Sequence, residues 1–277
     1  MISFLLWGRK SLNREPPAQG QLIVHYIDVG QGDCTLLISD GVTMLIDCGD
    51  AVKSGRVTSY ISSLGISRLD YVIGTHPHSD HMGGMADIIS SFEVGEVIIP
   101  HLRDEDVPTT VFFERFLDSI DSTGTALTEA ELYRRIELGE TECEIIAPVV
   151  TEPGDLNSYS VGILARHGQN TFIFTGDAER ESEAAMVGSG HLTHITVCKA
   201  GHHGSYTSCT EEFLAEITPD IVVISCGDEN TYGHPHDVLM QRLHWYTDEI
   251  YRTDTDGTIV VTSDGNEVIV SCAGREE

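Results

Sequence analysis

Lysine is scarce in this sequence of 277 residues, which contains only Lys10, Lys53 and Lys199. Its 16 Lys and Arg residues face 44 Asp and Glu residues, so that the formal net charge is -28. A broad basic surface for duplex nucleic acid is therefore excluded. An acidic, lysine-poor surface favours solubility and is also typical of proteins adapted to high salt.

Paired cysteines and long apolar runs are also missing. The seven cysteines are an odd number, and no two of them have C-x-x-C spacing, which excludes a disulfide-stapled scaffold and a thiolate zinc finger. No segment approaches the roughly 18 to 20 apolar residues that a membrane span requires, and the apolar start at residues 1–7 is too short for a signal peptide. We therefore expect a cytoplasmic chain with no membrane span.

The apolar content is sufficient for a folded core, since 40% of the residues are hydrophobic. Residues 1–20 contain Pro16 and Pro17 and have no periodic pattern, so they are predicted to form an N-terminal tail. Dense apolar runs begin at Gln21. We expect residues 21–277 to form a single domain.

The apolar pattern predicts an α/β fold in which both halves begin with a hairpin and continue with helix and strand units. The predicted strands are 22–29, 34–39, 42–47, 69–74, 94–99, 141–147, 160–166, 171–175, 195–199, 221–225, 250–253, 258–262 and 267–271. The predicted helices are 57–64, 81–91, 109–122, 210–217 and 236–246. Two similar halves, packed sheet against sheet with helices outside, are the architecture that this order favours.

Histidines are abundant, with 13 in the chain, and the most informative group follows the predicted strand 69–74. On an extended loop, the imidazoles of His76 and His78 can converge on one cation. Asp80 and His81 lie where the next helix begins, so that an oxygen and a nitrogen ligand can reach a second cation beside the first. The segment therefore predicts a metal site.

Other candidate ligands lie further along the chain. Asp177 follows the strand 171–175; alone it is typical of a helix cap, but a carboxylate held at a strand end can also bridge two divalent metals. His202 and His203 are adjacent and point in different directions, so at most one is expected to be a ligand, and the other is free for proton transfer or substrate contact. His234 is a further candidate.

The motifs together resemble those of the metallo-β-lactamase superfamily, and in particular the soluble hydrolase domain of ComEC-type competence proteins. The resemblance to phosphorylcholine esterases is looser. It covers about residues 22–265, and its motifs lie at 28–33, 46–49, 76–81, 176–177, 201–205, 230–235 and 252–257. The resemblance implies a four-layer αββα sandwich with a dinuclear metal site between the two sheets, and it extends to none of the membrane segments of ComEC.

The resemblance also implies roles for the matching residues. The metal ligands would be His76 and His78 for the first metal, Asp80 and His81 for the second, Asp177 as the bridge, and His203 and His234 to complete the shells. Asp47 would orient a ligand imidazole from the second shell. The superfamily's histidine before the bridging aspartate is absent; Asn157 begins that stretch as a second-shell candidate, and the third ligand of the first metal stays open. The ligand types suit two divalent ions, zinc or manganese.

Metal-activated water in such a site favours phosphodiester hydrolysis, because two cations stabilise both the attacking and the leaving oxygen. Single-stranded DNA or nucleic-acid ends are the preferred substrates, since they need less basic surface. Asp80 and His202 are the predicted catalytic residues, and Lys199, Ser205 and Asn230 are predicted to hold phosphate oxygens. The alternatives are a small-molecule phosphoesterase, a β-lactam or lactone hydrolase, and a non-catalytic scaffold that binds a partner.

Overall fold

The computed structural model describes residues 18–228 and 230–274. Most of the predicted N-terminal tail, residues 1–17, lies outside the described residues. No helix in the described segments combines the length and hydropathy needed to cross a bilayer.

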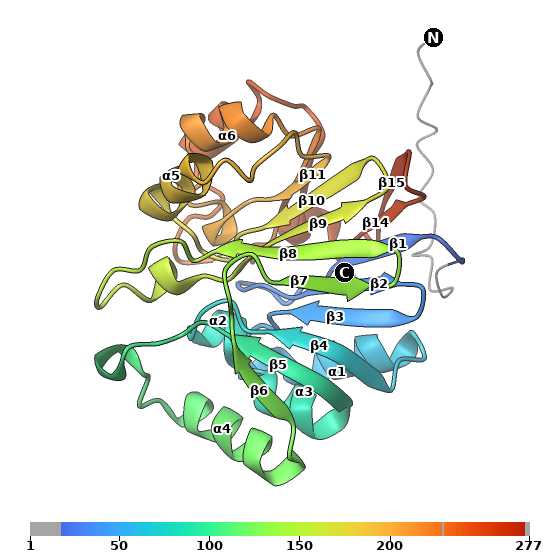
Figure 1. Cartoon of the computed structure of the whole chain (residues 1–277). Helices are drawn as coiled ribbons and strands as arrows, with labels where there is room; N and C mark the ends of the chain where they lie inside the picture. Colours follow the sequence, from blue (N-terminus) through green and yellow to red (C-terminus); the bar gives the residue numbers. More distant parts are fainter. Residues whose placement is uncertain (1–17, 229, 275–277) are drawn as a thin grey trace.

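Two sheets face each other at the centre of the fold (Figure 1). The first has eight strands, in the order β15 (Val268–Cys272), β14 (Ile259–Ser263), β1 (Leu22–Tyr26), β2 (Thr35–Ser39), β3 (Val42–Ile46), β4 (Arg68–Ile73), β5 (Glu93–Ile99) and β6 (Ala126–Glu129). The second has seven strands, in the order β13 (Ile250–Arg252), β12 (Ile221–Ile224), β11 (Val197–Lys199), β10 (Asn170–Phe174), β9 (Gly162–His167), β8 (Thr141–Ala147) and β7 (Arg135–Leu138).

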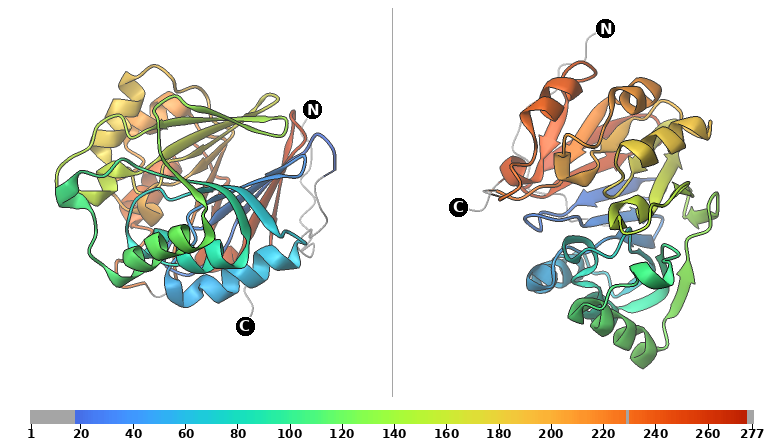
Figure 2. Two further views of the ribbon diagram at one scale, coloured as in Figure 1. Left: turned by 60° about the horizontal axis from the view of Figure 1, so that its bottom comes forward. Right: turned by 90° about the vertical axis from the view of Figure 1, so that its left-hand side faces the viewer.

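Helices cover the outer faces of both sheets, as Figures 1 and 2 show. The first half contributes α1 (Ser54–Ser63), α2 (Ser79–Met82), α3 (Met85–Ser91) and α4 (Val111–Thr123). The second half contributes α5 (Arg180–Gly188), α6 (Glu211–Ile217), α7 (Asp237–Leu243) and α8 (Thr253–Asp256). Short 3-10 turns are η1 (Ala51–Lys53), η2 (Asp104–Asp106), η3 (Leu156–Tyr159) and η4 (His202–Gly204). The predicted αββα sandwich is confirmed.

The core is divided between the layers because neighbouring side chains on a strand point to opposite faces. On β2, Leu37 packs between the two sheets, whereas Leu36 and Ile38 pack toward the helices of the first half. Phe172 on β10 also lies between the sheets, and its neighbour Ile173 faces the helices of the second half. The strands are therefore apolar on both faces, as in a sheet covered on both sides.

Parallel pairing determines where the polar loops lie. Strands β3, β4 and β5 run parallel to one another, and so do β10, β11, β12 and β13. Carboxyl ends of parallel strands meet at one edge of a sheet, which is where ligands bind in open α/β sheets. The loops that follow β3, β4, β10 and β11 therefore come together between the two sheets.

The structure differs from the predicted elements in several places, and strands β6 and β7 are among the elements that the prediction lacks. The helix expected over 81–91 is interrupted at Gly83 and Gly84, where the chain passes closely over residues 48–51; a Cβ on Gly83 would lie 2.8 Å from the backbone nitrogen of Ala51. Helix α5 is absent from the predicted elements, because its buried side chains include the polar Ser182 and Glu183. The two halves are also less alike than expected, since β14 and β15 at the end of the chain join the first sheet.

Candidate metal centre

Loops at the carboxyl ends of strands from both sheets bring the candidate ligands together. Thr75 and His76 follow β4, Asp177 follows β10, and His203 belongs to the η4 turn after β11. Backbone contacts join these loops across the sandwich, since the amide of Val161 donates to the carbonyl of Thr75 at 2.9 Å. His76, Asp177 and His203 are therefore each held by a segment that follows a buried strand, and His81 lies on the short helix α2 just after His76.

The described part of the chain contains two sets of potential ligand atoms, and within each set all atoms lie within 4.8 Å of one another. The first set comes from Asp33, His81, Asp177 and His203, and the second from His76, His78 and Asp177. Asp177 belongs to both sets. Its position between them is the position that a carboxylate bridging two metal ions requires.

Asp177 is buried and surrounded by imidazoles. Its Oδ1 lies 3.2 Å from Nε2 of His81, and its Oδ2 lies 3.6 Å from Nε2 of His203 and 3.8 Å from Nε2 of His76. Within the described chain, Oδ1 has no partner in hydrogen-bond geometry. A buried carboxylate oxygen without a donor is costly in a protein and is typical of a ligand for a cation.

Asp47 contacts the ring nitrogen of His81 that faces away from Asp177. Its Oδ2 lies 2.7 Å from Nδ1 of His81, and its two oxygens accept hydrogen bonds from the backbone amide and the hydroxyl of Thr75 at 2.9 and 2.7 Å. With Nδ1 engaged in this way, Nε2 of His81 points toward Asp177. This contact is the one expected of a second-shell carboxylate that orients a ligand imidazole.

Asp80 and His234 lie nearby but belong to neither set. Oδ2 of Asp80 is 3.2 Å from Nε2 of His203. The His234 ring is centred 6.3 Å from that of His203 and 5.6 Å from that of His202, and its Nδ1 lies 3.5 Å from Nε2 of Gln31. The structure thus brings all seven predicted ligands to one place, with Asp80 and His234 at the outer side.

His202 and His203 differ in orientation, as their adjacent positions predict. His203 is buried, and its Nδ1 contacts the backbone carbonyl of Ser225 at 3.1 Å, which directs Nε2 toward Asp177. His202 is partly exposed; its Nδ1 lies 2.8 Å from Oε1 of Glu179, and its Nε2 lies 3.7 Å from Oδ2 of Asp177. Nε2 of His203 is thus directed toward Asp177 from the buried side, whereas His202 lies at the pocket and is held by Glu179.

The buried carboxylates of the site stabilise positive charge on neighbouring groups. Burial alone would lower the pKa of His81, but the Asp177 and Asp47 carboxylates raise that pKa well above its usual range. Burial would likewise lower the pKa of His203, which Asp177 and Asp33 raise to about 10. At His76, burial and the neighbouring His81 hold the pKa well below its usual value. The carboxylates thus favour positive charge on the groups around them.

The residues present fit a dinuclear metal site. Nitrogen and carboxylate oxygen atoms converge from two sides on Asp177, one of its oxygens lacks a donor, and the second set contains only three protein ligands. Ser160 occupies the region beside the second set; its hydroxyl lies 3.4 Å from Nδ1 of His76 and accepts a hydrogen bond from the Asp177 amide at 3.0 Å. A set of three protein ligands leaves coordination positions open for water or substrate, as catalytic metal sites require.

A pocket of about 280 Å³ opens directly above these groups. Its lining comprises Gln31, His78, Ser79, Asp80, Asn157, Asp177, His202, His203, Tyr232 and His234, and as far as the structure describes it this lining contains no Lys or Arg. This volume of about 280 Å³ lies just below the range typical of ligand pockets, about 300 to 1,000 Å³. The pocket therefore encloses a reacting group and little more of a long substrate.

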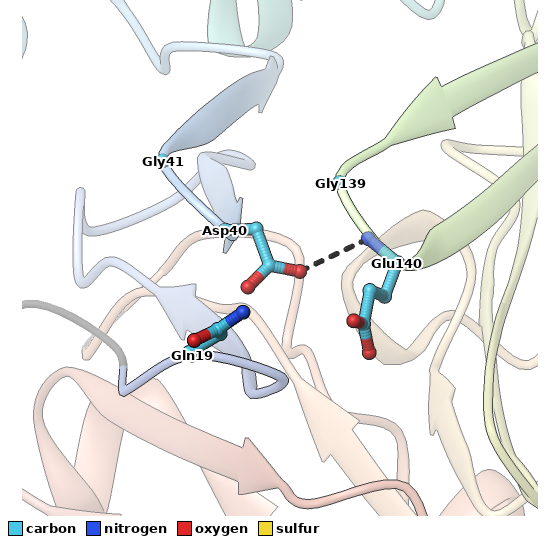
Figure 3. Close-up of a pocket in the computed structure, with 5 residues that line it drawn as sticks. All are labelled: Gln19, Asp40, Gly41, Gly139 and Glu140. Atoms are coloured by element: carbon cyan, nitrogen blue, oxygen red, sulfur yellow. Dashed lines mark hydrogen bonds between the residues drawn. The ribbon is translucent and has the colours of Figure 1, made fainter.

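A second cavity, of about 570 Å³, lies elsewhere and is drawn in Figure 3. It is lined by Gln19, Asp40, Gly41, Gly139 and Glu140, and the side chain of Asp40 accepts a hydrogen bond from the Glu140 amide at 3.1 Å. Asp40 and Gly41 form the turn between β2 and β3, at the opposite end of these strands from Asp33 and Asp47. The described lining has no histidine or cysteine, so we assign no chemistry to this cavity.

The three residues predicted to hold phosphate oxygens do not line the pocket. Lys199 is buried beside Asp33, with which its ammonium forms an ion pair, and it also donates to the Ala200 carbonyl at 3.0 Å. The Ser205 hydroxyl bonds to that of Thr207 at 2.8 Å. Asn230 donates to the carbonyls of Gly227 and His234, so it organises its own loop. Local hydrogen bonds thus occupy all three side chains.

Asn157 lies in the pocket but does not touch a predicted ligand; its Nδ2 donates to Oε1 of Glu179 at 3.3 Å. Glu179 in turn contacts His202, and no sequence pattern identifies it. The sequence also assigns no role to Asp33, although this residue ends the motif 28–33. The sequence signal that could have identified Asp33 is the glycine before it. Gly32 has a φ of +140°, which favours glycine, and it brings the loop against the backbone carbonyl of Asp80.

Comparisons with known proteins agree with this geometry. The model of the metallo-beta-lactamase superfamily matches residues 27–228. Recombination protein 2 of Haemophilus influenzae is 31% identical over 245 residues, which are 86% of this chain and 28% of that protein. ComE operon protein 3 of Bacillus subtilis is 27% identical over 254 residues, or 85% of this chain and 32% of that protein. The chain thus spans about a third of the length of these relatives.

Solved structures share the fold. The metallo-beta-lactamase fold protein YhfI from Bacillus subtilis superposes with a TM-score of 0.59 at 13% identity, covering 87% of this chain and all of that one (100%). CmlA from Streptomyces venezuelae, a diiron beta-hydroxylase, also has a TM-score of 0.59, at 17% identity. The superposition covers 87% of this chain and 54% of the CmlA chain. At these identities the likeness concerns the fold alone.

Proposed function

Because the chain belongs to the metallo-β-lactamase superfamily and its relatives support a metal-dependent hydrolase, we propose that it is a phosphodiesterase that acts on single-stranded nucleic acid or on nucleic-acid ends. The observation that carries this proposal is the position of Asp177 between two sets of ligand atoms at the floor of an open pocket.

The ligand sets would hold two divalent cations, zinc or manganese. His76, His78 and Asp177 would hold one, and His81, His203 and Asp177 the other, with Asp80 and His234 adjacent. Bound there, two cations would supply Lewis acidity to both oxygens of an in-line displacement at phosphorus and would acidify a water molecule. His and Asp ligands without cysteine suit these metals.

The chain itself supplies a proton carrier. Glu179 holds Nδ1 of His202 at 2.8 Å, so that Nε2 faces the pocket and Asp177. The hydrogen bond from His202 lowers the pKa of Glu179, which keeps this carboxylate charged and able to stabilise a proton on His202. His202 can therefore accept a proton on the nucleophile side or deliver one to the leaving oxygen.

Asp80 has a different role in the proposal. Burial alone would raise its pKa, but the hydrogen bond with His203 and the charge of His81 lower that pKa well below its usual range. The carboxylate is therefore charged at neutral pH, so it can act as a ligand but is a poor proton acceptor and has no proton to donate. Its contribution to catalysis would be to help to bind the metal ion and its water beside His203.

A nucleic-acid substrate is supported by the relative from Haemophilus influenzae, whose name refers to recombination. The absence of Lys and Arg from the described pocket lining, together with the net charge of -28, disfavours a duplex, whose binding depends on many phosphate contacts. A single strand can place one phosphodiester in the pocket while its bases lie outside. One further candidate, a small-molecule phosphoesterase, is favoured by the small pocket volume of about 280 Å³.

The test combines elemental analysis with hydrolysis assays. Purified wild-type protein, loaded with Mn²⁺ or Zn²⁺, is incubated with bis-p-nitrophenyl phosphate, with p-nitrophenyl phosphorylcholine and with a fluorescent single-stranded oligonucleotide. Cleavage of the oligonucleotide supports the proposal, whereas cleavage of the choline ester alone favours the small-molecule alternative. Asp177→Ala is expected to lose most of the bound metal and the activity together.

A matched control separates these effects from general damage. Asp248 has a side chain that is 97% exposed, and Asp248→Ala is expected to keep both metal and activity. His202→Asn is expected to keep the metal but lose turnover by about 10²- to 10⁴-fold, the usual contribution of a general acid or base. Full activity in Asp177→Ala would refute the proposal.

A further inference from the structure

Four aromatic rings form a continuous row that begins at the pocket, which we call the aromatic ridge: Tyr232, His234, His236 and Tyr206. The Tyr232 and His234 rings are nearly parallel, at 22°, with centroids 5.6 Å apart. His234 and His236 follow at 4.8 Å, and His236 and Tyr206 at 5.1 Å. The row links two loops, because the Tyr206 amide also donates to Nδ1 of His236 at 3.1 Å.

The two ends of the ridge are open to solvent. Tyr232 is 65% exposed and Tyr206 is 56% exposed, whereas His234 in between is buried. Tyr232 and His234 line the pocket, so that the ridge starts beside His202 and Asp177 and leads outward. Because ring contacts fix their orientation, these exposed tyrosines present flat faces at defined positions. An exposed tyrosine without such contacts would change its orientation freely.

Because the described pocket lining has no Lys or Arg side chain, base stacking would be the main source of affinity for a single strand. A polyanion that reaches the pocket finds no Lys or Arg in its described lining, and it approaches a molecule with a net charge of -28. Contacts to phosphates outside the metal centre are therefore weak. Aromatic faces attract the bases of a single strand irrespective of sequence, and each stacked base contributes about 1 to 3 kcal/mol.

We propose that the aromatic ridge is the base-binding platform of this protein, on which the base next to the scissile phosphate stacks against Tyr232 and a base further along the strand reaches Tyr206. The inference rests on the proposed function for its substrate class. The inference specifies the kind of substrate: it must carry unpaired bases, which the ridge binds by stacking and not by charge. A duplex keeps its bases stacked on one another and does not offer them to the ridge.

The test compares two probes with the same backbone and the same charge. Fluorescein-labelled (dT)12 and a 12-mer of abasic residues are titrated with the full chain by fluorescence anisotropy, as isolated and again in EDTA, and gels verify that the probes stay intact. Wild-type protein is expected to bind (dT)12 more tightly. Tyr232→Ala is expected to weaken binding of (dT)12 roughly 5- to 150-fold, which corresponds to about 1 to 3 kcal/mol, and to leave binding of the abasic probe unchanged.

Two controls define the role of the ring. Tyr232→Phe keeps an aromatic face and is expected to bind (dT)12 as wild type does. Trp245→Ala removes another exposed aromatic, 71% exposed and outside the ridge, and is expected to change nothing. The loss in Tyr232→Ala is also expected to be equal at low and high salt, because stacking, unlike phosphate contact, releases no counterions.

The outcomes separate this inference from the proposed function. Equal binding of both probes by wild type, or equal weakening of both by Tyr232→Ala, would overturn the platform, even if the oligonucleotide is cleaved. A base-dependent loss in Tyr232→Ala supports the platform, even if no metal confers phosphodiesterase activity. A loss of binding to phosphorylcholine in Tyr232→Ala with (dT)12 binding unchanged would assign the ridge to a cationic ligand and overturn it as well.

Discussion

Lys199 forms an ion pair with Asp33, a member of the first set of potential ligands, and disruption of this pair has a predictable cost. The two side chains are each 3% exposed. Burial alone would lower the pKa of Lys199, but the Asp33 carboxylate raises it, so the lysine is charged at neutral pH. The next cationic candidates, Nδ1 of His203 and Nδ1 of His81, lie 3.5 and 3.8 Å from Asp33, too far for good hydrogen bonds.

Lys199→Met therefore leaves a buried carboxylate without its partner. Breaking a buried pair in this way costs about 3 to 5 kcal/mol, because the remaining charge is not solvated and has lost its nearest counter-charge. The double variant Asp33→Asn with Lys199→Met removes both charges, and we expect it to regain more than half of the lost free energy of unfolding. Replacement of a whole buried pair by neutral groups is often close to neutral.

Urea unfolding at pH 7 in EDTA, followed by circular dichroism, measures these differences. With a slope of about 3 kcal/mol per molar urea, the single variant should unfold at least roughly 1 M earlier. Lys53→Met, at an exposed lysine, serves as the control and is expected to stay within about 0.5 kcal/mol of wild type. A Lys199→Met protein as stable as wild type would refute the reasoning, and so would a double variant no more stable than the single one.

Two further predictions concern Asp47 and Glu183. Asp47→Asn should weaken metal affinity about 10- to 100-fold, measured by chelator competition, because it alters the partner of His81 Nδ1; unchanged affinity would contradict the orienting role. Burial raises the pKa of Glu183 to about 7, although its oxygens accept the amides of Cys209 and Thr210. A folded pKa above the unfolded one gives stability that is complete below the unfolded pKa of 4.5 and is lost as the pH rises through 7. Relative to Glu183→Gln, wild type should therefore lose roughly 3 kcal/mol of unfolding free energy between about pH 4.5 and 8. A pH-independent difference, like that expected for Glu181→Gln at an exposed position of the same helix, would exclude this titration.

Much of the fold follows from local patterns. Apolar runs of about five or six residues between turn signals predict most strands, since both faces of these strands are covered and the runs are unbroken. Gly124 ends α4 with a φ of +68°, as its position after the helix pattern indicates. Helix α5 escapes prediction because Glu183, a buried polar residue, interrupts its apolar face. The split between α2 and α3 escapes prediction because the backbone at 48–51, which Gly83 and Gly84 approach, is distant in sequence.

The same distinction holds for the candidate site. His76, His78, Asp80 and His81 lie close together in the chain, so their clustering requires no knowledge of the fold. Glu179 escapes the sequence analysis because only the folded chain places it on Nδ1 of His202. Lys199 illustrates a similar limit: its ammonium points inward to Asp33, and no local pattern tells which way a strand-end lysine turns.

The amino-acid sequence by itself determined the kinds of atoms available to a metal, the strand ends on which they stand and the two-layer character of the sheets, because these depend on residue type and short periodicity. The tertiary structure alone decided which groups meet. Asp33 and Lys199 form a pair although most of the domain separates them in sequence, and Tyr206 joins Tyr232 through two histidines, since such contacts arise from how separate loops pack at one edge of the sandwich.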